Sequence, residues 1–230
     1  TVDVTATHTA FRPDFSMPSE GVKVYGIDGK QQRRRGNYYE GARRSTFDLD
    51  VKEEGTYGLM YVRDGSYHTR YKIGRSDEFK RLRLNKSAAA KKIAKNATEV
   101  TTTKYRTVAM SYLTNKAPTD AVLKTKGVGF ELFPVTHPAD YVTGENLKIQ
   151  FSFDGKPVEG VEVVIEQEGP QYRENPAALT LKTNKEGTID FTLDNGGRYA
   201  LKVNHEQPSA DPEADTEITR LFYAFEVIYE

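Results

Sequence analysis

The side chains best suited to bind a transition metal or to carry a proton near neutral pH are the four histidines, His8, His68, His137 and His205. No two of them stand at the short spacings that bring two metal ligands together on a helix or a strand. His137 precedes Pro138, which favours an extended backbone at His137, and Asp140 follows three residues later. A loop at this point could therefore present His137 and Asp140 side by side.

A metal site there would need a third ligand from elsewhere in the chain, and the candidate set is His137, Asp140 and His205. The sequence itself requires no cofactor, and nickel, cobalt, copper and zinc are the possible cations. The alternative is that His137 packs in a bulge or loop at a domain interface. His8 and His205 stand at the ends of apolar strand faces, where a histidine at a sheet edge is also common. His68 lies on the strand face opposite Tyr67, Thr69 and Tyr71 and is therefore expected to face solvent.

A second candidate site lies in the basic and polar segment 31–44, which we expect to be a long loop. The residues expected to contact a ligand there are Arg33, Arg34, Tyr38 and Tyr39. Guanidinium groups and tyrosine rings together suit polyanionic or saccharide ligands, through charge and stacking. The alternative is a solvated loop whose charge is balanced by Glu40 and Asp48.

The motifs of common enzyme classes are absent from the sequence. There is no Gly-x-Ser-x-Gly nucleophile motif and no glycine-rich phosphate loop. The absence of cysteine excludes a disulfide framework, a thiolate metal site and a cysteine nucleophile. Basic and acidic residues number 33 each, so the net charge supplies no reason to bind nucleic acid or an anionic membrane. We expect a protein without enzymatic activity.

The elements that must position these side chains are strands. The chain has 14 tyrosines and 11 phenylalanines, and aromatic residues favour the half-buried surface of a sheet. Residues 46–51 and 147–153 alternate between apolar and polar, which is the period of a strand. Asp28-Gly29 and Asp64-Gly65 are hairpin-turn signals, and Glu186-Gly187 supplies a positive φ. Short strands at this spacing predict antiparallel sandwiches.

One helix is expected, over residues 87–95, because this run is rich in alanine and lysine. Asn85 or Ser87 could cap its first turn. The run contains few large apolar residues, so we expect a short connector helix on the surface.

The predicted fold class is all-β, with two β-sandwich domains. The expected boundaries are an N-terminal sandwich over 1–84, a connector with the short helix and a strand over 85–126, and a C-terminal sandwich over 127–230. Seven short strands make the C-terminal domain immunoglobulin-like or transthyretin-like.

Several motifs occur in a characteristic order. They are Arg44-Ser45-Thr46-Phe47-Asp48-Leu49, Gly55-Thr56-Tyr57, Phe133-Pro134-Val135-Thr136-His137-Pro138, Gly144-Glu145, Phe153-Asp154-Gly155-Lys156-Pro157-Val158, Thr183-Asn184-Lys185-Glu186-Gly187 and Gly196-Gly197-Arg198-Tyr199. In these motifs the sequence resembles the DUF4198 family of bacterial secreted proteins, which were once described as periplasmic components of cobalt or nickel uptake systems. The most specific part of the resemblance lies in the C-terminal domain.

The resemblance implies a periplasmic or extracellular protein, and the strand pattern that begins at Thr1 suggests a chain from which a signal peptide has been removed. It further implies a non-catalytic binding or accessory protein linked to nickel, cobalt or TonB-linked uptake. Its partner would be a membrane transporter or a TonB-dependent receptor. The alternative function is a structural or adhesive β-sandwich module that binds a protein or a glycan without a metal.

Overall fold

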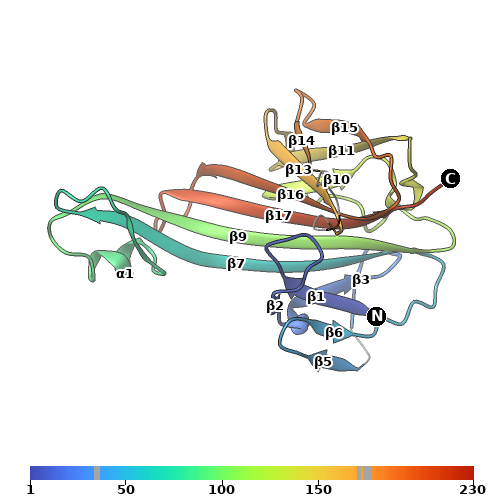
Figure 1. The fold of residues 1–230 in the computed structure, drawn as a ribbon, viewed down its shortest axis with the longest axis horizontal. Coiled ribbons are helices and arrows are strands. Elements are labelled where there is room, and N and C mark those ends of the chain that lie inside the picture. The colour runs from blue at the N-terminus through green and yellow to red at the C-terminus, as the bar shows by residue number, and fades with distance from the viewer. Residues whose placement is uncertain (34–36, 170–171, 173–177) are drawn as a thin grey trace. The chain divides into compact units, whose positions relative to one another are not determined.

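A computed structural model describes residues 1–33, 37–169, 172 and 178–230. The described residues form several β-sheets and one short α-helix, which confirms the all-β fold class (Figure 1). In chain order the elements are β1 (Val2–Ala6), β2 (Phe15–Ser16), η1 (Ser19–Gly21), β3 (Val22–Tyr25), β4 (Gln31–Gln32), β5 (Tyr38–Glu40), β6 (Ser45–Phe47), β7 (Gly55–Ile73), β8 (Lys80–Leu82), α1 (Lys86–Ala90), β9 (Ala97–Asn115), β10 (Phe130–Pro134), η2 (Pro138–Asp140), β11 (Asn146–Phe153), β12 (Lys156–Pro157), β13 (Glu162–Gln167), β14 (Ala178–Lys182), β15 (Thr188–Thr192), β16 (Gly197–Pro208) and β17 (Thr216–Val227). None of the described helices has the length and apolar character needed to cross a membrane.

The chain divides into two compact units. The first comprises Thr1–Tyr61, Ala109–Val203 and Leu221–Glu230, and the second comprises Val62–Val108 and Asn204–Arg220. The long strands β7, β9, β16 and β17 contribute residues to both units. The domain boundaries at residues 84 and 126 stay a prediction.

The C-terminal part of the first unit is a two-layer sandwich. One layer contains β10, β11, β12 and β15, and the other contains β13, β14, β16 and β17 (Figure 1). Alternate residues of both layers are almost completely buried, and they are Leu147, Ile149, Phe151, Val163, Ile165, Leu201 and Val203. The strict period of two in their sequence therefore predicts which face of each strand forms the core.

The N-terminal part of the first unit is a small antiparallel sheet in the order β2-β1-β6-β5. Phe47 of this sheet packs in a cluster with Val22 and Val24 of β3. Strands β4 and β5 lie inside segment 31–44, so the expectation of an uninterrupted loop was wrong. All the residues of both strands are exposed and most are polar, and pairing with β3 and β6 makes them strands despite that composition.

A second correction concerns Asp64-Gly65, which we expected to form a hairpin turn. The dipeptide lies inside the 19-residue strand β7. Gly65 has the positive φ of 78° that such a signal predicts, and the Asp64 carboxylate accepts a hydrogen bond from the Gly65 N–H. A glycine in this conformation is compatible with a bulge in a paired strand as well as with a turn. The sequence signal is local and does not distinguish the two.

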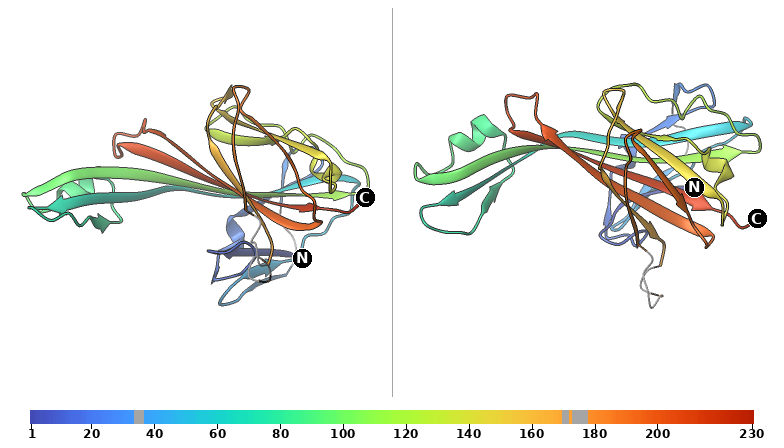
Figure 2. Two further views of the ribbon diagram at one scale, coloured as in Figure 1. Left: turned by 45° about the horizontal axis from the view of Figure 1, so that its top comes forward. Right: turned by 90° about the horizontal axis from the view of Figure 1, so that it is seen from above.

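The predicted helix is present but short. Helix α1 lies in the connection between β7 and β9 (Figure 2) and is capped by the Asn85 side chain, which accepts a hydrogen bond from the Ala88 N–H at 3.1 Å. It ends at Ala90 rather than near residue 95. Ala89 is its buried residue, and the lysines that follow, Lys91, Lys92 and Lys95, are exposed, so no packing of their side chains stabilises a longer helix.

A network of polar side chains holds the turn between β16 and β17 in the second unit. The carboxylate of Asp211 accepts hydrogen bonds from the Tyr67 hydroxyl at 2.5 Å and from the Glu213 N–H at 3.0 Å. The Lys104 ammonium lies 3.1 Å from the same carboxylate. These contacts, led by the hydrogen bond from Tyr67, lower the pKa of Asp211 to about 2. The ionised form of Asp211 therefore stabilises this part of the second unit.

Acidification is expected to loosen this turn. Because the pKa of Asp211 is about 2 in the folded chain and 3.8 ordinarily, its stabilising effect is complete above the ordinary pKa and is lost as the pH falls from about 4 towards 2. The protection of the Glu213 and Ala214 amides, measured as their exchange rates relative to an unstructured peptide at the same pH, should fall over that interval. In Asp211→Asn this protection should already be low at neutral pH and should vary less with pH. An unchanged pH profile in this variant would contradict the assignment.

Candidate functional site

The structure uses both ring nitrogens of His137 to hold the fold. His137 is the N-cap of η2, and its Nδ1 accepts a hydrogen bond from the Ala139 N–H at 3.0 Å. Its Nε2 lies 3.2 Å from Oγ1 of Thr56 and 3.4 Å from the carbonyl oxygen of Thr119. A metal bound to His137 would have to displace one of these partners.

The other two residues of the predicted metal site lie at separate places in the chain. Asp140 is the last residue of η2 and is exposed. His205 lies in β16, in the second unit, where burial lowers its pKa. Within the described ranges, no group of three or more histidine, cysteine, aspartate or glutamate side chains is placed to hold a metal ion. The site made of His137, Asp140 and His205 stays a prediction.

The tyrosines of the second candidate site lie on the edge strand β5. Tyr38 is opposite Phe47 of β6 and Tyr39 is opposite Thr46, so the two tyrosines point to opposite faces of the sheet. The Tyr38 hydroxyl donates to a carboxylate oxygen of Glu40 at 2.8 Å, and this bond raises the pKa of Tyr38 to about 12. Arg33 is exposed after β4, and Arg34 lies outside the described residues.

Tyr39 belongs to a polar row on the outer face of the N-terminal sheet. Its ring is 68% exposed, and Thr46 and Asp3 follow it across strands β6 and β1. The Asp3 carboxylate accepts hydrogen bonds at 2.8 Å from the Thr46 hydroxyl and from the Arg44 guanidinium. This row presents an aromatic ring beside an ordered set of hydrogen-bonding groups, which is a composition suited to a polar ligand such as a saccharide.

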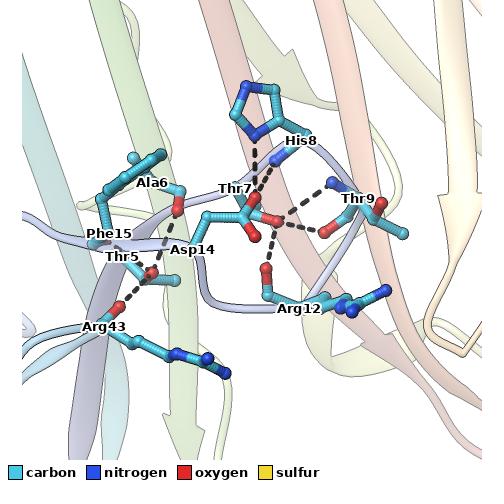
Figure 3. Close-up of polar contacts among 9 residues, drawn as sticks. All are labelled: Thr5, Ala6, Thr7, His8, Thr9, Arg12, Asp14, Phe15 and Arg43. Carbon is cyan, nitrogen blue, oxygen red and sulfur yellow. Dashed lines mark hydrogen bonds and ion pairs between the residues drawn. The ribbon is translucent and has the colours of Figure 1, made fainter.

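The most exposed histidine is His8, in the loop between β1 and β2 (Figure 3). The Asp14 carboxylate accepts one hydrogen bond from the His8 backbone N–H at 2.8 Å and lies 2.9 Å from Nδ1 of the ring. The bond from the backbone N–H, followed by the contact with the ring, lowers the pKa of Asp14. Because an ionised carboxylate only accepts hydrogen bonds, the neutral ring carries its proton on Nδ1 and its lone pair on Nε2.

The loop around His8 is fixed by local hydrogen bonds. The Thr9 N–H donates to the Thr7 hydroxyl at 3.1 Å (Figure 3). The Arg12 N–H donates to the Thr9 carbonyl oxygen at 3.0 Å. The Asp14 N–H donates to the Ala6 carbonyl oxygen at 3.1 Å, which places Asp14 beneath the loop. The His8 side chain is 84% exposed, so its Nε2 is open to a ligand from solution.

No pattern in the sequence pairs His8 with Asp14. The two residues are six positions apart, and they meet because β1 and β2 pair in an antiparallel register that joins Thr5 with Ser16. Both residues lie within a short hairpin, but the sequence does not reveal this hairpin. Strand β2 has two residues, which are too few to show an alternation of apolar and polar residues.

Comparison with known proteins gives one positive result. No curated protein matches the chain. Residues 1–207 match the family model described as "Domain of unknown function (DUF4198)", a match that includes His8, the N-terminal sheet and most of the C-terminal sandwich. Since these residues are nine-tenths of the 230-residue chain, the protein belongs to the DUF4198 family.

Proposed function

We propose that this protein is a non-catalytic binding protein of the periplasm or the cell exterior, and that it takes a transition-metal ion on His8. The observation that carries the proposal is the orientation of the ring. Asp14 holds Nδ1, and Nε2 faces solvent with its lone pair available. In metal proteins a ligand histidine commonly donates its other nitrogen to a carboxylate in this way.

A single imidazole supplies one bond to the ion. Water, or groups of a partner, would fill the remaining positions, because zinc, nickel, cobalt and copper take four or more ligands. Such a site binds weakly and releases its ion readily, as an accessory that passes metal to a transporter or a TonB-dependent receptor requires. The earlier association of the family with cobalt and nickel uptake points to the same class of ligand.

Titration of the untagged protein with Ni²⁺, Co²⁺, Cu²⁺ and Zn²⁺ tests the proposal. Calorimetry should detect binding of at least one ion, and His8→Ala should abolish it. Asp14→Asn should weaken it by about 10-fold, since loss of the orienting carboxylate commonly costs that much metal affinity. With Zn²⁺, the side-chain nitrogen resonances of His8 should shift most.

His68→Ala is the matched control, because His68 is half-buried in the second unit and should not contribute. Equal binding heats for His8→Ala and the unmodified protein would contradict the proposal. So would the absence of binding by all four ions.

The second candidate function is a structural or adhesive module that binds a protein or glycan partner without a metal. The polar row beside Tyr39 favours it, because an exposed ring next to Asp3, Thr46 and Arg44 suits a saccharide. A second surface that combines an aromatic ring with polar groups is a depression of about 420 Å³. It is lined by Lys124, Thr125, Phe133, Gln150 and Ser152. This function becomes the better one if none of the metal ions binds.

A further inference from the structure

The second unit carries a concentration of arginines on one face of its sheet. Arg70 of β7 is directly opposite Arg81 of β8 in the antiparallel register. Cross-strand partners point to the same face, and His68, two residues before Arg70 in β7, shares it. Arg83 follows β8 directly, and its charge acts on His68. The three arginine side chains are exposed.

The same face continues across β9 and β17. The His68 ring packs edge-on against Tyr105, with the ring centres 5.1 Å apart, and this contact explains why His68 is half-buried rather than solvent-facing. The guanidinium carbon of Arg220 lies 4.4 Å from the centre of the Tyr105 ring. We call the surface formed by His68, Arg70, Arg81, Arg83, Tyr105 and Arg220 the basic face.

The arginine charges of the basic face have no carboxylate partner. In the part of the chain that the structure describes, Arg70, Arg81, Arg83 and Arg220 form no ion pair. Burial first, and then the nearby charges of Arg83, Arg220, Arg63 and Arg81, lower the pKa of His68. The charges of these four arginines therefore all act on the His68 ring.

Two carboxylates of this unit, those of Asp211 and Asp215, are engaged by other groups. Asp211 contacts Tyr67 and Lys104, which alternate with His68 and Tyr105 along their strands and so point to the opposite face. Asp215 pairs with Lys86. Beside the basic face, the ammonium of Lys72 lies 2.8 Å from the carboxylate of Glu99. Like charges placed opposite each other destabilise a sheet. Because the arginines of the basic face are separated from carboxylates, an anionic binding partner would remove this repulsion.

We propose that the basic face docks on the anionic phosphate headgroups of a phospholipid bilayer. Guanidinium groups bind phosphate through two parallel hydrogen bonds. The arginines are distributed over β7, β8 and β17, so the charges form a two-dimensional array, which matches a planar layer of headgroups better than a single polyanionic strand.

An aromatic ring at the edge of the face supports the same partner. Phe79 is 36% exposed and lies under two cations, with the guanidinium carbon of Arg70 at 5.1 Å and the ammonium of Lys72 at 4.8 Å from the ring centre. Phenylalanine beside basic residues is typical of protein surfaces that insert at the boundary between lipid headgroups and acyl chains. The basic face contains none of the residues near His8, so its docking on a bilayer does not depend on metal binding.

Vesicle co-sedimentation of the full chain tests the proposal. The protein should bind vesicles of phosphatidylcholine that contain a quarter of phosphatidylglycerol, should bind pure phosphatidylcholine vesicles much less, and should be released by salt. Each arginine is expected to strengthen binding about 5-fold. The triple variant Arg70→Gln, Arg81→Gln, Arg220→Gln should therefore bind about 100-fold more weakly.

Two variants make the result specific. The matched control replaces Lys91, Lys92 and Lys95 by glutamine, which removes the same charge from exposed residues after α1, and it should retain binding. Replacing the three arginines by lysine keeps the charge and should preserve most of the binding even if the glutamine variant folds poorly.

Three outcomes would overturn the proposal. The first is equal binding to anionic and neutral vesicles, and the second is an equal loss of binding in the lysine-to-glutamine control. The third is binding of soluble polyphosphate without binding of vesicles, which would assign the basic face to a polyanionic chain.

Discussion

Phe151→Ala is expected to lower the free energy of unfolding of the first unit by about 3–5 kcal/mol. Phe151 of β11 is 0% exposed, and its ring stacks on Phe130 with the ring centres 5.9 Å apart. It is also directly opposite Leu132 of β10. Removing the ring deletes a large buried apolar surface and leaves a cavity that the neighbouring strands can only partly close.

Urea denaturation followed by far-ultraviolet circular dichroism measures this effect. Phe222→Ala is the matched control, because it removes the same atoms from a side chain of β17 that is 38% exposed. Its cost should be about 1 kcal/mol. Equal shifts of the unfolding midpoint for the two variants would show that Phe151 does not have the packing role assigned to it.

Gly187→Ala is expected to destabilise the same sandwich by about 3–4 kcal/mol, through backbone strain and a steric clash. Gly187 has a φ of +70°, and a Cβ added to it would lie 2.4 Å from the carbonyl oxygen of Phe151 and 3.0 Å from the backbone nitrogen of Val158. Both contacts are with backbone atoms, which cannot rotate away. The Phe151 N–H also donates to the Gly187 carbonyl oxygen at 2.7 Å, so the clash would separate paired segments.

Gly160→Ala separates the two effects. Gly160 has a φ of +76°, but a Cβ there meets no atom within 4 Å. Its substitution should cost only the strain of the left-handed conformation, about 1–2 kcal/mol. The difference between the two alanine variants measures the clash with the Phe151 backbone, and a difference of zero would rule the clash out.

The net charge of this chain does not reveal how its charges are distributed over the surface. With 33 basic and 33 acidic residues, the sequence predicted no electrostatic attraction to an anionic membrane. In the second unit, however, the arginines gather on one face while Asp211 and Asp215 bind groups elsewhere. A neutral protein can therefore present a strongly basic surface, because recognition depends on local charge and not on the sum.

In the candidate sites, too, the sequence indicated the local backbone but not the contacts with distant residues. The sequence indicated that the backbone at His137 is extended before Pro138, and its ψ of 136° confirms this. It did not indicate that Thr56 and the Thr119 carbonyl would lie beside Nε2, because they come from distant parts of the chain. It also did not pair His8 with Asp14, since that contact depends on the register of β1 and β2.

The sequence alone determined the features that depend on neighbouring residues. Alternation over residues 147–153 predicted the buried face of β11, Asn85 was one of two predicted caps for α1, and Glu186-Gly187 predicted a positive φ. Each of these follows from backbone stereochemistry or from the period of a strand, which act over a few residues.

Only the tertiary structure decided which strands pair and therefore which side chains meet. Asp64-Gly65 became part of the long strand β7, and segment 31–44 gained two strands because β3 and β6 supply their hydrogen-bond partners. The basic face joins Arg70, Arg81 and Arg220, which no local pattern connects. Strand pairing brings together residues far apart in sequence, and the interactions that select the partner are absent from any short segment.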